Sequence, residues 1–291
     1  MNKHRLLIIF FAFFLTLQAF GQSFYALKRE RKFIVFGGLN TSTYYGDLKD
    51  KKDILDIKPS VTIGGQYYFT NRIGARAEFS WVTLSGADED SDDEGKIKRN
   101  LSFKSSNYEV AVSGIVNLLP HGRRFYQRPP FNAYGFIGVG VLFFNPKAEQ
   151  EGKTYVLHDY QTEGVDYSRT SFIIPYGIGG RVQVNPFFNV CVELGWRKTF
   201  TDYIDDVSTV YLDNASFTDD RARKLADRRW ELEPPLEPLE AGKKRGDPSN
   251  DDAYMLMSVK VEYYLPYEIL GFQQRKLYKS KRKAYYKRRR R

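Results

Sequence analysis

Hydrophobic and polar residues alternate with a period of two along much of the chain, and the alternation is clearest between positions 171 and 198. Two runs there, 171–184 and 188–198, place apolar residues on one face and polar residues or glycines on the other, and Asn185-Pro186 joins them. Alternation over about a dozen residues is longer than a strand of a soluble sheet needs. About 9–11 residues of a tilted strand cross the hydrocarbon of a bilayer. The pair therefore predicts a membrane-crossing hairpin.

The same pattern recurs often enough to predict eight strands. They are expected at 33–45, 59–69, 73–84, 108–118, 131–144, 171–184, 188–198 and 253–264. This pattern favours an all-β fold, an eight-stranded antiparallel up-and-down transmembrane β-barrel. Short and long connections alternate, and outer-membrane barrels have short periplasmic turns and long outer loops. We therefore expect a bacterial outer-membrane location with both termini periplasmic.

Three of the connections carry more specific expectations. The acidic loop 87–98 has too little apolar content to become ordered on its own. The segment 145–170 is expected to be a long polar loop. The longest connection, 200–252, contains the run 218–230, in which Thr218 precedes two acids and apolar residues at helical spacing. That run predicts a short helix.

Charged residues also occur on the faces that would point into the barrel, four of each sign. They are Arg76, Glu78, Glu109, Arg181, Glu193, Arg197, Lys260 and Glu262. An eight-stranded barrel leaves an interior that side chains just fill. Opposite charges can pair there without a net buried charge. The sequence therefore predicts a lumen charge network and a plugged lumen.

The ends of the chain differ from this central part. Lys3 and Arg5, the apolar run 6–17 and the small residues near position 21 are typical of a signal peptide, here 1–21. The barrel would then comprise 22–265 and a basic periplasmic tail 266–291. The formal net charge is +10, and the tail holds eleven basic residues against one acid, Glu268. The rest of the chain is therefore neutral.

The basic residues of the tail are a candidate partner-binding segment. They are Arg275, Lys276, Lys279, Lys281, Arg282, Lys283, Lys287, Arg288, Arg289, Arg290 and Arg291. Export removes nucleic acid as a partner, which leaves an acidic protein, an acidic polymer or the anionic phosphates of the membrane. A solubilising tail without a partner is the alternative.

Few residues suggest catalytic or metal chemistry. His121 and His158 fall in separate connections, so exposed loop histidines are favoured over the active site of a lipid-modifying barrel enzyme. The carboxylates between Asp202 and Asp206 could bind calcium, but this run lacks the glycine and terminal glutamate of an EF-hand loop. A solvated turn is the favoured interpretation. We expect no enzyme activity, no cofactor and no metal.

Several segments resemble the PorG-like outer-membrane barrel proteins of the type IX secretion system. The segments are GGLNTSTYYGDLKD (37–50), KPSVTIGGQYYF (58–69), WRKTFTDYIDDVSTVY (196–211), ADRRWE (226–231) and KRGDPSNDDAYMLMSVKVEYY (244–264), and TDYIDDVST is the most specific part. The resemblance implies a non-enzymatic component of the secretion and gliding machinery. It also implies contact with a periplasmic ring made of PorK-like and PorN-like proteins, besides outer-membrane lipid. The alternative is a small adhesin or receptor barrel that acts through its outer loops.

Overall fold

The computed structural model describes residues 31–49, 58–122 and 126–265. Residues 32–265 form one compact unit. The expected signal peptide, 1–21, and the basic tail, 266–291, lie outside the described residues. Both therefore stay predictions.

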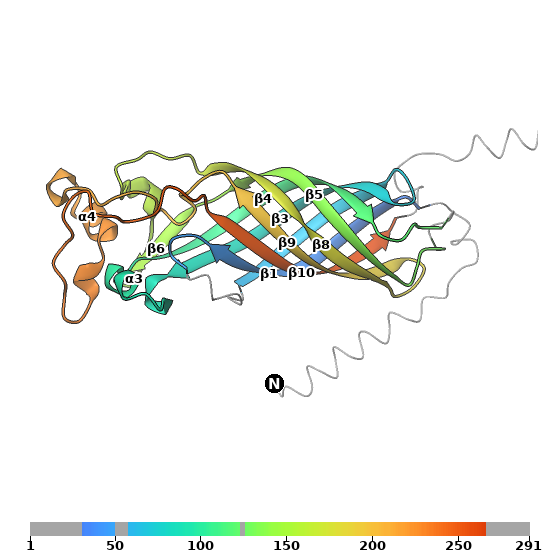
Figure 1. Ribbon diagram of the computed structural model, residues 1–291, viewed down its shortest axis with the longest axis horizontal. Coiled ribbons are helices and arrows are strands. Elements are labelled where there is room, and N and C mark those ends of the chain that lie inside the picture. Colours follow the sequence, from blue (N-terminus) through green and yellow to red (C-terminus); the bar gives the residue numbers. More distant parts are fainter. Residues whose placement is uncertain (1–30, 50–57, 123–125, 266–291) are drawn as a thin grey trace, which may run out of the picture. The chain divides into compact units, whose positions relative to one another are not determined.

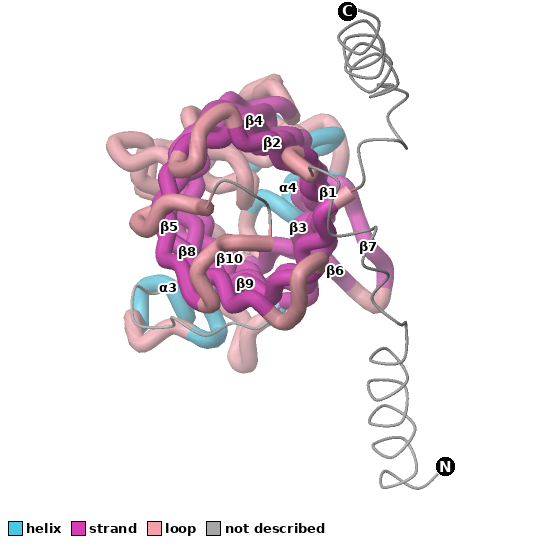
Figure 2. Tube along the Cα trace, turned by 90° about the vertical axis from the view of Figure 1, so that its right-hand side faces the viewer, coloured by secondary structure: helices cyan, strands magenta, loops and turns pink. Residues whose placement is uncertain are grey.

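Eight strands form a closed antiparallel barrel (Figures 1 and 2). The barrel strands are β1 (Phe33–Tyr45), β2 (Lys58–Tyr68), β3 (Ile73–Ala87), β4 (Ser102–Asn117), β5 (Phe131–Phe143), β8 (Thr170–Gln183), β9 (Phe188–Thr199) and β10 (Ala253–Tyr264). Each strand pairs with its neighbour in the chain order, and β1 pairs with β10 from Ile34↔Tyr264 to Tyr45↔Ala253. The predicted fold class is confirmed. One end of the barrel, the short-turn end, carries the connections 69–72, 118–130 and 184–187; the opposite end is the long-loop end.

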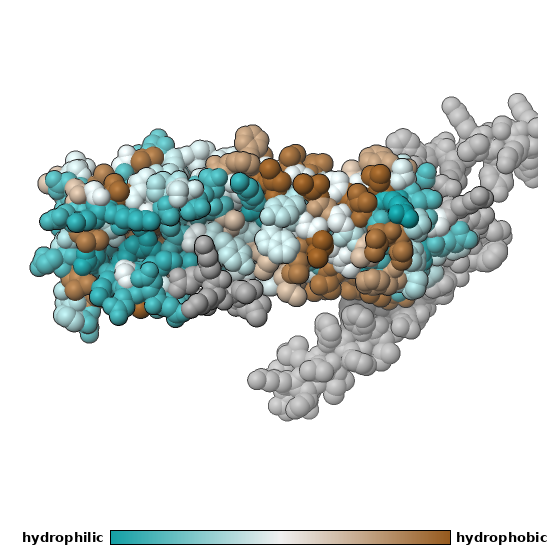
Figure 3. Space-filling model, viewed as in Figure 1, coloured by the Kyte–Doolittle hydropathy of each residue, from teal (hydrophilic) through white to brown (hydrophobic). Residues whose placement is uncertain are grey.

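The outer wall is apolar and exposed. Phe172 is 73 % exposed and Leu39 is 72 % exposed, values that the outside of a water-soluble sheet would not show along every strand. Figure 3 shows the apolar side chains gathered over the barrel, away from the polar long-loop end. This is the surface that a lipid-facing wall requires.

Aromatic residues mark two levels of that wall. On the long-loop side, Trp81, Tyr108 and Phe143 are register partners on three successive strands. On the short-turn side, Phe33 pairs with Tyr67, and Phe188 pairs with Tyr263. Rings at two such levels are typical of the two headgroup regions of a bilayer.

The acidic loop 87–98 is ordered, so the expectation of disorder was wrong. It forms a 3-10 turn, η2 (Asp88–Asp90), and a short helix, α3 (Glu94–Arg99). The Asp88 carboxylate is fully buried and accepts hydrogen bonds from the Arg99 guanidinium at 2.6 and 2.7 Å and from the Leu101 amide at 2.9 Å. The composition of the loop did not reveal that its acids have fixed partners.

The other long connections also contain regular elements. The expected polar loop 145–170 holds a hairpin, β6 (Pro146–Gln150) and β7 (Lys153–Val156), followed by η3 (Leu157–Tyr160). Strand β6 extends the wall because it pairs with the start of β4. The predicted helix at 218–230 is shorter, α4 (Asp220–Ala226), with η4 (Asn214–Ser216) before it and η5 (Arg229–Glu231) after it.

The N-cap of α4 is Asp219, whose side chain accepts from the Arg221 amide, and not Thr218 as predicted.

Among the described residues, no helix has both the length and the apolar character needed to cross a bilayer. The helices belong to the long-loop end (Figure 1).

Candidate functional site

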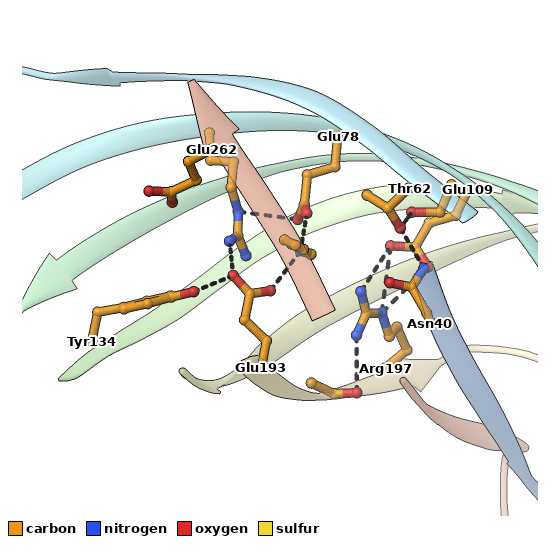
Figure 4. A network of polar contacts seen from close by, with 12 residues as sticks. Asn40, Thr62, Glu78, Glu109, Tyr134, Glu193, Arg197 and Glu262 are labelled. Atoms are coloured by element: carbon orange, nitrogen blue, oxygen red, sulfur yellow. Dashed lines mark hydrogen bonds and ion pairs between the residues drawn. The ribbon is translucent and has the colours of Figure 1, made fainter. Parts of the chain in front are cut away.

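A four-residue ion cluster lies at the centre of the interior (Figure 4). Arg76 of β3 contacts Glu193 of β9 at 2.5 Å and Glu78 at 3.1 Å. Lys260 of β10 contacts Glu78 at 2.6 Å and Glu193 at 2.5 Å. The Tyr134 hydroxyl donates to Glu193 at 2.6 Å. Because β3 and β9 stand on opposite sides of the barrel, this cluster bridges the lumen.

The other four predicted lumen charges form two further pairs. Arg181 donates to both carboxylate oxygens of Glu262 at 2.7 Å. Arg197 lies 3.3 Å from Glu109, which also accepts from the Tyr254 hydroxyl at 2.7 Å. All eight charged side chains are at most 4 % exposed. Four cations and four anions thus occupy the interior as neutral pairs, the arrangement in which buried charge is tolerated.

Uncharged side chains occupy more of the interior. Asn40 donates to Thr62 at 2.7 Å, and Thr62 contacts Ser80 at 2.8 Å, which links β1, β2 and β3. The Phe136 ring lies under the Arg76 guanidinium at 4.4 Å. These contacts join nearby strands, and the ion pair between Arg76 and Glu193 joins opposite walls, so side chains contact one another within the lumen as they do in barrels of this strand number.

At the short-turn end, Arg128 ties the last residues before β5 to the β8–β9 turn. Its guanidinium donates to Asn189 and to the backbone oxygens of Pro186 and Asn185, each at 2.9 Å. It also lies over the Tyr264 ring at 4.2 Å. Arg128 is therefore a buried side chain with several partners at this end of the barrel.

The two candidate histidines lie at opposite ends of the barrel and cannot share a site. His121 is half-buried at the short-turn end against the Tyr68 ring, and burial lowers its pKa to about 4. His158 is half-buried at the long-loop end, where it lies 3.0 Å from the Tyr167 carbonyl and 3.4 Å from Asp166. Neither is the exposed loop histidine that we expected, because each packs against a tyrosine ring.

The long-loop end contains a hydrophobic cluster, which we call the cap core. It consists of Tyr44, Leu48, Val82, Leu84, Leu101, Phe103, Leu142, Phe144, Ala148, Leu157, Ile173, Ile204, Val207, Leu225, Tyr254 and Leu256. The segment 201–209 lies within it, and Ile204 and Asp205 are fully buried. The expectation of a solvated turn at 202–206 was wrong, because Ile204, Asp205 and Asp206 are buried and the last two have hydrogen-bond partners inside the protein.

Each buried carboxylate of this segment accepts hydrogen bonds from a different loop. Asp205 accepts from the amides of Val207 at 3.0 Å and Leu48 at 3.3 Å. Asp206 accepts from the hydroxyls of Tyr167 at 2.6 Å and Thr162 at 2.5 Å. Sequence alone did not show these partners, which come from the β1–β2 and β7–β8 connections.

Asp252, immediately before β10, is a further buried carboxylate of the long-loop end. It accepts from the Tyr44 hydroxyl at 2.5 Å and from the Ile204 amide at 2.9 Å. The long insertion is therefore tied at its end to the strand that begins the barrel.

Arg245 and Glu163 tie the insertion to the β7–β8 connection. The Arg245 guanidinium donates to Glu163 at 2.7 Å and to the backbone oxygens of Asp206 at 2.6 Å and Ala226 at 3.2 Å. Glu163 also accepts from the amides of Ser208 and Thr209. Sequence reasoning missed both residues, since neither stands in a recognisable motif.

Burial makes several of these acids weak. It raises the pKa of Asp202 to about 8 and that of Asp205 to about 7. It also raises the pKa of Asp206 to about 6 although Arg245 and two hydroxyls favour the ionised form, and it raises the pKa of Asp252. Outside Arg99 and Arg245, few cations face this group, so the closed cap favours protonated carboxyls.

Within the described ranges, no three His, Cys, Asp or Glu side chains are arranged to hold a metal ion. The carboxylates between Asp202 and Asp206 instead accept hydrogen bonds from the protein. The calcium interpretation thus gains no support from the geometry.

A closed barrel with an apolar wall and a paired ionic interior defines a small integral outer-membrane protein. The chain belongs to the family described as outer membrane protein β-barrel domain, whose model matches residues 12–219. Among curated proteins, none matches the chain significantly. This family is broader than the PorG-like proteins, so the finer assignment remains a proposal.

The chain is also similar to several solved structures. Neisserial surface protein A shares 9 % identity, with 80 % of this chain and 97 % of that one covered and a TM-score of 0.41. Ail, the attachment invasion locus protein of Yersinia pestis, shares 14 %, with 80 % and 98 % covered and a TM-score of 0.38. OprG from Pseudomonas aeruginosa shares 10 %, with 81 % and 98 % covered and a TM-score of 0.37.

Proposed function

We propose that this protein is a non-enzymatic outer-membrane barrel component of the type IX protein secretion and gliding machinery. In this proposal the short-turn end faces the periplasm and the basic tail contacts the periplasmic ring of PorK-like and PorN-like proteins. The barrel serves as an anchor and not as a conduit, since its interior side chains pair across the lumen.

One observation carries the proposal: segments of the resemblance that are far apart in sequence converge in the cap. Tyr44 and Leu48, from 37–50, contact Asp252 and Asp205. The amides of Arg245 and Gly246, from 244–264, both donate to the Thr209 carbonyl at 2.9 Å. A similarity confined to alternating strands would fit many barrels. A similarity in residues that build one particular cap supports kinship with proteins that carry the same cap.

The test is affinity isolation of the full-length protein from detergent-solubilised envelopes of its own cells. We expect ring proteins to be recovered with the full chain and lost when residues 266–291 are deleted. A tail with the same residues in scrambled order is the matched control, because it keeps the charge and the length. If ring proteins fail to appear with the full chain, or appear equally after tail deletion, the proposal of tail contact is wrong.

A small adhesin or receptor is the second candidate, favoured by the ordered cap. The cap holds α4 and the exposed Pro-rich residues 233–238 on an anchored base, where the Leu239 amide donates to Asp227 at 3.0 Å. A surface presented this rigidly suits a binding partner. Under this candidate, replacing 233–238 by a Gly-Ser linker of equal length abolishes function and tail deletion does not; the type IX proposal expects tail deletion to abolish it.

A further inference from the structure

The outer wall has an apolar hollow on β4, β5, β8 and β9 near the short-turn end. Its volume is about 770 Å³. Ala133, Gly135 and Gly180 form its floor, and Leu118 and Val192 stand at its two sides. The strand register explains the shape, because Ala133 lies beside Gly180, and Gly180 lies beside Val192. Small residues on adjacent strands leave the backbone as the floor between two ridges.

The hollow is in the part of the wall that faces hydrocarbon. Ile178 and Leu118, both at its margin, are 62 % and 65 % exposed. An empty apolar hollow would cost the lining atoms their dispersion contacts. Water would gain no hydrogen bonds there, since the floor residues are committed to ladders between strands. A flexible hydrocarbon chain can make dispersion contacts with the lining atoms that water cannot replace.

A cation stands at the rim of the hollow. Arg72 lines it from the turn between β2 and β3, and its backbone oxygen accepts from the Asn117 amide at 2.8 Å, which holds the turn beside β4. Its side chain is exposed, and among the described residues it takes part in no ion pair. A guanidinium at the headgroup level is suited to a phosphate, with which it forms charge-assisted hydrogen bonds.

We propose that this hollow binds one phospholipid of the leaflet beside the short turns, with an acyl chain between the Leu118 and Val192 ridges and the phosphate on Arg72. This inference does not depend on the secretion role. It distinguishes one retained lipid from the exchanging lipids around the rest of the wall.

The test uses full-length protein in nanodiscs that contain phosphatidylglycerol with a photoactivatable diazirine in the acyl chain. After irradiation, mass spectrometry of peptides locates the adducts. We expect them to concentrate on 131–137 and 178–182, compared with outward residues of β1 and β2. Arg72→Gln should lower the yield at these peptides about tenfold, the loss that corresponds to one charge-assisted hydrogen bond.

Filling the hollow provides the decisive variants. A Cβ at Gly135 would come no closer than 3.8 Å to a neighbouring atom, and one at Gly180 no closer than 3.5 Å, to the Phe131 ring, so both positions have room for a Cβ and a leucine there would extend into the hollow. Gly135→Leu and Gly180→Leu should each reduce the local adduct several-fold. Gly37→Leu is the matched control, because Gly37 faces outward on β1 with its nearest contact at 4.0 Å.

Heat-modifiable migration on a gel would show that each variant is folded. Adducts spread evenly around the barrel, or unchanged by Gly135→Leu and Gly180→Leu, would overturn the proposal in favour of ordinary annular lipid. A photoreactive residue at Ile178 in intact cells supplies the second check. Crosslinking there to a protein in place of lipid would likewise overturn it.

Discussion

At the residue scale, both members of an interior ion pair can be replaced together at much lower cost in stability than either member alone. Arg181 and Glu262 make a bidentate contact in which each group has no comparable counter-ion nearby. Removing one leaves the other buried and uncompensated, whereas removing both leaves no charge to compensate. The same reasoning is weaker for the central cluster, because Arg76 and Lys260 share the same two glutamates.

We expect Arg181→Met and Glu262→Leu each to lower the free energy of unfolding by about 3–5 kcal/mol, the cost of an unpaired buried charge. The double variant should lose much less than the sum of the two. Urea-dependent unfolding in lipid vesicles measures this double-mutant cycle. Ser258→Ala, at a buried neutral position of β10, is the control. Additive losses would show that the pair is not coupled.

At the scale of elements, the long loops act as a second, smaller fold built on the barrel rim. Strands β3 and β4 pair as far as Ala87 and Ser102, beyond the aromatic level marked by Trp81 and Tyr108. The cap core occupies this extended part of the wall. Because the carboxylates beside the cap core are buried with few cations, the stability of the cap should depend on pH.

The direction of this pH dependence follows from the raised pKa values of the cap carboxyls. Asp205 and Asp206 have pKa values of about 7 and about 6 in the closed cap, against about 4 for a solvated aspartate. The closed cap thus holds more protons than the open one, so its stability is full below about pH 4 and falls as the pH rises to about 7. Protease cleavage within 200–252 should be faster at pH 8 than at pH 5.

Asp205→Asn should flatten this pH dependence, because the amide cannot ionise. Asp251→Asn, at an exposed neighbouring position, should leave it unchanged. Amide hydrogen exchange of 201–209 at both pH values gives an independent measurement. Equal cleavage rates at pH 5 and pH 8 in the parent protein would contradict the argument.

The link that Arg245 makes between the long insertion and the β7–β8 connection can be tested by substitution. Arg245→Met should release the insertion from Glu163 of the β7–β8 connection and make 200–252 sensitive to trypsin, while the barrel keeps its heat-modifiable migration. Lys244→Met is the control, since Lys244 is exposed and its side chain forms a surface ion pair with Asp247. Equal protection of both variants would show that Arg245 is dispensable.

At the scale of the whole molecule, we expect the interior side chains to block the lumen independently of the cap. The ion cluster around Arg76 bridges β3 and β9, and Arg128 is buried at the short-turn end, where it donates to Pro186. Replacing 203–250 by a short Gly-Ser linker should therefore produce no channels in planar bilayers. Arg76→Ala combined with that replacement removes one bridge across the lumen and serves as the contrast. Steady conductance in the linker variant alone would show that the cap, and not the interior, closes the barrel.

The sequence predicted the barrel well because inside and outside positions differ in a single repeating property. The eight inward charges could be found in the same way, since alternation alone assigns them to the lumen. The cap could not, because Asp205, Arg245 and Glu163 meet only after segments far apart in sequence are brought together. Charge-rich composition at 87–98 and 202–206 suggested solvent, whereas the structure supplies a partner from the same loop for Asp88 and partners from other loops for Asp205 and Asp206.

The cap core also constrains the order of assembly. Its members include Tyr44 in the first strand, β1, and Tyr254 and Leu256 in the last, β10, so it cannot form before those strands meet. Trp81 and Trp196 face lipid, whereas Trp230 belongs to the insertion, where its indole donates to the Lys224 carbonyl. A folding experiment that follows each tryptophan separately should therefore see membrane entry first and Trp230 last. Formation of the cap core would therefore indicate that the barrel below it has already closed.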